Sequence, residues 1–117
     1  LSVAIMGDYA FGMVGLDIET AVRERIPILV IVLNNSSMSI YSPDSFPVAN
    51  ELYGTKYLTG DYAGVAEAMG AYNERVEQPA EVVPAILRAQ REIAAGRPAL
   101  LEFITSEERA FSHKSAV

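Results

Sequence analysis

The sequence lacks cysteine and tryptophan, has a single histidine, and contains no apolar run long enough to span a membrane. The absence of cysteine excludes disulfide bonds and any thiol nucleophile. Nine Lys and Arg residues are scattered among fifteen Asp and Glu residues, for a formal net charge of -6, and they form no basic stripe. We therefore expect a protein of the cytoplasm that has neither nucleic acid nor a membrane as partner.

The apolar pattern predicts two buried, parallel strands in the first third of the chain. Residues 1–6 (LSVAIM) and 28–33 (ILVIVL) are nearly continuous apolar runs, which are typical of strands covered on both faces by helices. Four apolar residues between the two runs share one face of a predicted helix. They are Val14, Ile18, Ala21 and Val22. A strand, a helix and a strand of this length form a crossover, so we expect an α/β fold, a three-layer parallel sheet with helices on both faces.

Later segments predict further elements of the same sheet. Residues 43–60 have two prolines and no apolar period and are expected to form a long loop. Asp61 is expected to cap the helix that follows. Residues 71–76 form a more polar strand, expected nearer an edge, and residues 98–104 (PALLEFI) form the last strand. A second helix, which ends at Gly96, lies between these two strands.

Polar residues follow both of the first two strands. Gly7 and Asp8 come after the first strand, and Asn34 and Asn35 come after the second. The carboxyl ends of parallel strands meet at one edge of the sheet, where ligands of open α/β folds bind. Neither GDYAFG nor NNSSMSIYS contains Lys or Arg, so a phosphate bound here would need a metal to neutralise it. Asp8 and Asn35 carry the oxygen ligands that Mg²⁺ prefers, although both segments are also ordinary turn sequences.

The segment from Gly7 to Asn35 resembles the Gly-Asp to Asn-Asn signature of thiamine diphosphate-dependent enzymes, the group of pyruvate decarboxylase, acetolactate synthase, benzaldehyde lyase and oxalyl-CoA decarboxylase. DYAGVAEAMGAYNERVE and GRPALLEFIT are similar to later segments of the same family. The resemblance implies thiamine diphosphate and Mg²⁺ as cofactors. It implies that the metal is bound by the side chains of Asp8 and Asn35 and by the carbonyl oxygen of Ser37. It also implies that the backbone holds the diphosphate around Gly7, Asp8, Tyr9, Ala10, Asn35 and Ile40.

The resemblance covers only the later part of the diphosphate-binding domain. We therefore expect residues 1–105 to be a partial C-terminal domain that lacks its N-terminal strands, followed by a tail at residues 106–117. The Glu that activates the cofactor and the apolar residue that bends it belong to family segments absent here. The catalytic residues are accordingly unknown, and we expect the chain alone to be inactive. Tyr41 is the single candidate, since some members place a polar group there over the thiazolium ring. The alternative, which the residue type favours, is a partly buried aromatic in a loop.

The implied function is to make or break a carbon–carbon bond next to a carbonyl, as a lyase or transferase of the 2-oxo acid decarboxylase or acetolactate synthase kind. One alternative is a 2-hydroxyacyl-CoA lyase or oxalyl-CoA decarboxylase, in which Arg109, His113 and Lys114 of the tail could contact CoA. An alternative of another class is a non-catalytic α/β domain that serves subunit contacts. The implied partners are a 2-oxo acid or acyl-CoA substrate, the remaining domains of the enzyme, and further copies in a homodimer or homotetramer.

Overall fold

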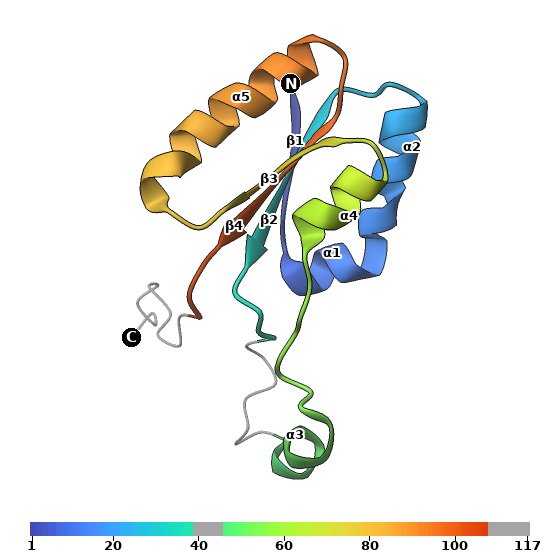
Figure 1. Ribbon diagram of the computed structural model, residues 1–117. Coiled ribbons are helices and arrows are strands. Elements are labelled where there is room, and N and C mark those ends of the chain that lie inside the picture. Colours follow the sequence, from blue (N-terminus) through green and yellow to red (C-terminus); the bar gives the residue numbers. More distant parts are fainter. Residues whose placement is uncertain (39–45, 108–117) are drawn as a thin grey trace, which may run out of the picture.

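Four strands form one parallel sheet, and helices cover both of its faces (Figure 1). The computed structural model describes residues 1–38 and 46–107 of the chain. The order of the strands across the sheet is β1-β2-β4-β3. The strands are β1 Ser2–Gly7, β2 Ile28–Asn34, β3 Tyr72–Val76 and β4 Ala99–Ile104. This arrangement confirms the predicted three-layer α/β fold.

The helices that pack on the sheet divide between its two faces according to the path of the chain. The helical elements are α1 Asp8–Val14, η1 Gly15–Asp17, α2 Ile18–Arg23, α3 Pro47–Tyr53, α4 Tyr62–Ala68, η2 Pro79–Glu81 and α5 Val82–Ala94. Residues of α1, α2 and α4 pack on one face, and residues of α5 pack on the other. Across the sheet, the chain moves from β1 through β2 to the far edge strand β3, and it then moves back to β4, which lies between β2 and β3. Right-handed crossovers therefore require α5 to lie on the opposite face.

The central strand β4 is buried along nearly its whole length. Leu100 faces the cluster formed with α1, α2 and α4, whereas Leu101 faces the cluster formed with α5. This alternation follows from the period of two along a strand. The two clusters account for the continuous apolar run of β4, in which Glu102 is the exception. No helix in the described part of the chain is long and apolar enough to cross a membrane.

The strand β1 lies at an edge of the sheet, so the expectation that it is buried on both faces is wrong. Leu1 is 73% exposed, Val3 47% and Ile5 64%. Among the described residues, only β2 pairs with β1, and its outer edge has no neighbouring strand. By contrast, β2 has a strand on each side and is buried at residues 29–32. The polar strand β3 lies at the opposite edge, as expected.

The single helix expected between the first two strands is broken in the structure. α1 ends at Val14, a 3-10 turn follows, and α2 begins at Ile18. Val14 is exposed instead of buried, and Phe11, at 4% exposure, belongs to the core. The Phe11 ring packs edge-on against Tyr62, with 5.5 Å between the ring centroids. A Cβ atom on Gly15 would meet this ring at 2.5 Å, so the packing requires glycine at the turn.

Residues 43–60, expected to be a loop, contain the helix α3. None of its residues is buried, which explains why no apolar period reveals it. Pro47 occupies the first turn of α3, where its missing N–H costs nothing. The predicted cap of α4 is confirmed, because the Asp61 carboxylate accepts a hydrogen bond from the Gly64 amide at 2.8 Å.

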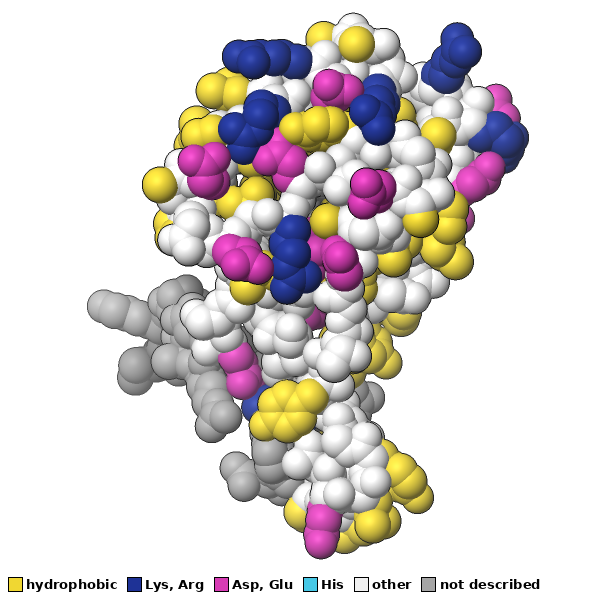
Figure 2. Space-filling view, in the orientation of Figure 1, with side chains coloured by type: hydrophobic (Ala, Val, Ile, Leu, Met, Phe, Trp, Pro, Cys, Tyr) yellow, Lys and Arg dark blue, Asp and Glu magenta, His cyan; other side chains and the backbone are white. Residues whose placement is uncertain are grey.

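On the face shown in Figure 2, acidic and basic side chains are interspersed.

Substituting Gly15 by Ala should destabilise the fold, because the added methyl group forces the buried Phe11 ring out of place. We expect a loss of about 1–3 kcal/mol, the usual cost of overpacking. Gly12→Ala is the matched control, since a Cβ atom there has no neighbour within 4 Å and alanine favours the helix. Urea unfolding followed by circular dichroism measures both variants. Equal stabilities would contradict the packing described for Phe11.

Candidate functional site

An open depression of about 430 Å³ lies at the carboxyl ends of β1 and β2. The two strands run in parallel register, with Gly7 opposite Leu33. The polar residues that follow each strand therefore meet at this edge, as predicted. The lining residues are Gly7, Asp8, Tyr9, Ala10, Leu33, Asn35, Ser37, Met38 and Thr105.

Asp8 is the first residue of α1 and is buried, at 3% exposure. Its Oδ1 atom accepts a hydrogen bond from the Tyr9 amide at 2.7 Å. Its Oδ2 atom is buried and has no hydrogen-bond partner within the described residues. A buried carboxylate oxygen without a partner is costly, so this atom calls for a cation or a donor. Asp8 thus meets the requirement for a metal ligand in the depression.

The turn after β2 brings Asn35 and Ser37 to the same depression. Ser36 has a positive φ of 53°, which turns the chain sharply after the strand. The Asn35 Oδ1 atom accepts a hydrogen bond from the Ser37 amide at 3.0 Å. An amide oxygen has two lone pairs, so one remains for a metal. The Ser37 hydroxyl is a second buried polar group without a partner in the part of the chain that the structure describes.

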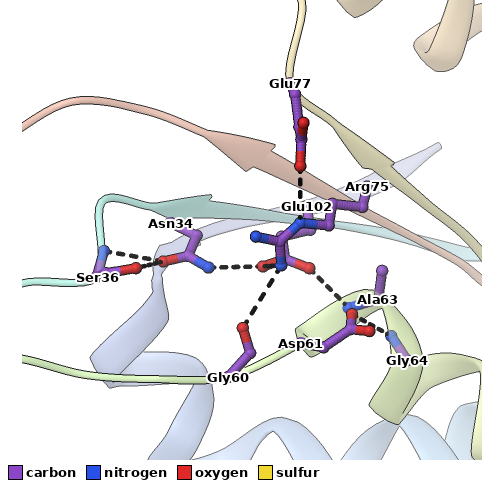
Figure 3. Close-up of polar contacts among 9 residues, drawn as sticks. All are labelled: Asn34, Ser36, Gly60, Asp61, Ala63, Gly64, Arg75, Glu77 and Glu102. Carbon is purple, nitrogen blue, oxygen red and sulfur yellow. Dashed lines mark hydrogen bonds and ion pairs between the residues drawn. The ribbon is translucent and has the colours of Figure 1, made fainter.

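Asn34 does not line the depression and has a different role from Asn35. Asn34 is the last residue of β2, whereas Asn35 lies just after the strand, and only Asn35 lines the depression. The Asn34 side chain donates a hydrogen bond through Nδ2 to Glu102 Oε1 at 2.6 Å (Figure 3). Its Oδ1 atom accepts bonds from the Ser36 amide at 2.9 Å and hydroxyl at 3.2 Å. Asn34 therefore fixes the turn that presents Asn35.

Glu102 is a fully buried carboxylate on β4 that sequence reasoning missed. Besides Asn34, it accepts a bond from Arg75 Nη1 of β3 at 3.1 Å and from the Ala63 amide of α4 at 3.0 Å (Figure 3). Both carboxylate oxygens are thus satisfied, which a buried charge requires. One feature of the sequence does indicate this role: Glu102 is the lone charged residue in the apolar run ALLEFI. A charged residue buried in such a strand must have partners.

The Tyr62 hydroxyl lies within the electrostatic influence of both carboxylates. Burial raises the pKa of Tyr62, and the negative charges of Asp8 and Glu102 raise it further. Tyr62 therefore stays neutral at physiological pH. Its ring packs edge-on against that of Phe11.

The oxygen donors of the depression suit a hard cation whose remaining ligands are phosphate oxygens and water. No Lys or Arg occurs among its described lining residues, and Asp8 is their only carboxylate. The described residues also contain no group of three or more His, Cys, Asp or Glu placed to hold a metal. One carboxylate, one amide oxygen and a serine suit Mg²⁺, which is usually bound through few carboxylates together with phosphate and water.

Several predicted residues lie outside the described part of the chain. These are Ile40, Tyr41, Arg109, His113 and Lys114. The roles implied for them stay predictions. The structure does bring together Gly7, Asp8, Tyr9, Ala10, Asn35 and Ser37.

Residues 1–103 match the family model described as "Thiamine pyrophosphate enzyme, C-terminal TPP binding domain". The chain is similar to the acetolactate synthase large subunit IlvG of Mycobacterium tuberculosis, with 31% identity over an alignment of 118 residues. This alignment covers 97% of this chain and 20% of that protein. It is 33% identical over 110 residues to the 2-hydroxyacyl-CoA lyase of Oryza sativa, covering 89% of this chain and 18% of that protein.

The fold is similar to the crystal structure of benzoylformate decarboxylase from Polynucleobacter necessarius. The TM-score is 0.68 at 25% sequence identity, and the match covers 91% of this chain and 20% of that one. The chain thus spans about a fifth of the length of the relatives it matches.

Replacing Glu102 by Gln should destabilise the fold, because the new amide group faces donors from Asn34, Arg75 and Ala63. We expect a loss of about 2–4 kcal/mol, as for a buried polar group left unsatisfied. Glu77→Gln is the control, since Glu77 also pairs with Arg75 but its side chain is 64% exposed. That variant should stay within about 0.5 kcal/mol of the unaltered protein. Equal unfolding midpoints for the two variants would show that Glu102 is not the anchor described.

Proposed function

Because this chain belongs to the thiamine pyrophosphate enzymes, of which it carries the C-terminal TPP-binding domain, we propose that the depression holds the cofactor's diphosphate through a Mg²⁺ ion. The observation that carries this proposal is the buried, unpartnered Oδ2 atom of Asp8. The described lining contains no basic side chain, so a metal ion would neutralise both the carboxylate and the diphosphate.

The sites implied by the resemblance are given these roles in the proposal. The side chains of Asp8 and Asn35 and the carbonyl oxygen of Ser37 bind Mg²⁺. The backbone at Gly7, Tyr9, Ala10 and Ile40 holds the diphosphate. When bound, thiamine diphosphate supplies a carbanion that adds to a carbonyl and stabilises the charge left there. The residues of this chain orient the cofactor and neutralise its phosphates.

The proposed reaction makes or breaks a carbon–carbon bond next to the carbonyl of a 2-oxo acid, as a decarboxylase or an acetolactate synthase does. The relatives, a synthase, a lyase and a decarboxylase by name, support this class. A second candidate is the cleavage of a 2-hydroxyacyl-CoA, supported by the 33% identity to the Oryza sativa lyase. A non-catalytic subunit-contact domain is the weaker proposal, because it gives the unpartnered Asp8 oxygen no role.

The proposed partners of this chain are the remaining domains of a longer enzyme and further copies in a homodimer or homotetramer. The exposed apolar side chains of β1 support this proposal, since Leu1, Val3 and Ile5 would be covered by such partners. The proposed location is the cytoplasm, in keeping with the absence of cysteine.

Cofactor binding by the full-length enzyme should require a divalent cation. Asp8→Ala and Asn35→Ala should each raise the dissociation constant of thiamine diphosphate about tenfold or more, the usual cost of disturbing a metal site. Titration calorimetry with and without Mg²⁺ measures this effect. Asp17→Ala, which removes an exposed carboxylate from the adjacent turn, is the control and should leave binding unchanged. Tight binding of the cofactor without any metal would contradict the proposal.

The 117-residue chain alone should show no decarboxylase or lyase activity. The family's activating carboxylate is expected on a segment that this chain does not contain. Assays of the purified chain with pyruvate and with a 2-hydroxyacyl-CoA, at saturating cofactor and Mg²⁺, test this expectation. Turnover above the rate of the Asp8→Ala variant of the same chain would refute it.

A further inference from the structure

The turn that carries Ser37 is paired with a second segment of the chain, residues 56–58. The Met38 amide donates a hydrogen bond to the Lys56 carbonyl oxygen at 2.8 Å, and the Leu58 amide donates one to the Ser36 carbonyl oxygen at 3.0 Å. These two bonds flank an antiparallel bridge between Ser37 and Tyr57. The backbone around Ser37 is therefore set by the position of residues 56–58.

Lys56 anchors this second segment through a buried ion pair. The residue is only 1% exposed, although lysine is rarely buried. Its Nζ atom lies 2.8 Å from Glu107 Oε1 and 5.8 Å from the centre of the Tyr57 ring. A buried ammonium group depends on such a partner, because its desolvation is otherwise uncompensated.

Glu107 belongs to the segment that follows β4, and this segment also reaches the site. The Thr105 amide donates a hydrogen bond to the Asn34 carbonyl oxygen at 2.8 Å. Thr105 itself lines the depression. The Lys56–Glu107 pair thus joins two segments that each bond to the turn at residues 34–38.

We propose that the Lys56–Glu107 ion pair positions the turn at residues 34–38 for binding of the metal and the diphosphate, an inference that rests on the proposed function. Lys56 acts through the backbone ladder, and Glu107 acts through Lys56. Both are positioning residues. If Lys56 contacted the diphosphate directly, removing the charge of Glu107 would not weaken binding, so Glu107 variants separate the two roles.

The test uses cofactor affinity in the full-length enzyme with Mg²⁺. Glu107→Gln keeps an oxygen acceptor but removes the charge, and it should raise the dissociation constant of thiamine diphosphate about tenfold, as does the loss of a group that orients a metal ligand. Exchanging the charges in the double variant Lys56→Glu, Glu107→Lys should restore most of the affinity.

The control is Glu74→Gln, which removes a carboxylate from the ion pair with Arg88 between β3 and α5. The Glu74 side chain is 21% exposed and that of Glu107 is 20%, so the two carboxylates are matched in burial. The control should leave cofactor affinity unchanged.

A second measurement needs no cofactor. In Glu107→Ala, amide hydrogen exchange at Met38 and Leu58 should become at least about tenfold faster, because their hydrogen bonds form the ladder that Lys56 anchors. In Glu74→Gln it should not change.

Two results would overturn the inference in distinguishable ways. If the unaltered enzyme binds the cofactor with Mg²⁺ and Glu107→Gln binds it equally well, or if exchange in Glu107→Ala is unchanged, the positioning role is wrong and the proposed function stands. If the unaltered enzyme itself binds no thiamine diphosphate with Mg²⁺, the proposed function is wrong and the inference falls with it.

Discussion

The buried carboxylate of Glu102 is the constraint on which the site depends. It lies on the central strand with no exposure to solvent, and it accepts hydrogen bonds from β2, β3 and α4. A charge in this position must be fully satisfied, so these three elements can adopt only the arrangement that supplies the donors. The bond from Asn34 fixes the end of β2 and therefore the start of the turn that carries Asn35 and Ser37.

The site itself contrasts with this satisfied network. The Asp8 Oδ2 atom and the Ser37 hydroxyl are buried without a partner among the described residues, and both residues line one depression. The polar groups of the Glu102 network are hydrogen-bonded, whereas oxygen atoms in the depression are not. This contrast is expected when a protein leaves coordination positions for a ligand. The buried Lys56–Glu107 pair lies on segments that are hydrogen-bonded to the same turn, which is why we propose a positioning role for it.

The sequence predicts the architecture and the meeting of Asp8 with Asn35 because both follow from local patterns. Apolar runs identify parallel strands, and parallel strands place their carboxyl ends together. Contacts between distant residues have no such pattern. The three partners of the Glu102 side chain, Arg75, Ala63 and Asn34, lie 27, 39 and 68 residues away along the sequence. Lys56 and Glu107 are likewise joined only by the fold.

Local exceptions also escaped prediction for identifiable reasons. The break after α1 depends on the Phe11 ring lying over Gly15, a contact that helical periodicity does not encode. The exposure of β1 depends on its place at the sheet edge, which an apolar run alone cannot show.

In the proposed function, a divalent cation joins Asp8 to the diphosphate in the depression. Anomalous diffraction from Mn²⁺ in crystals of the full-length enzyme grown with thiamine diphosphate tests it most directly. We expect an anomalous peak at a coordination distance of about 2.1 Å from Asp8 Oδ2, with Asn35 Oδ1 and diphosphate oxygens also bound to the metal. A diphosphate seated in the depression with no metal at Asp8, or a metal bound elsewhere, would contradict it.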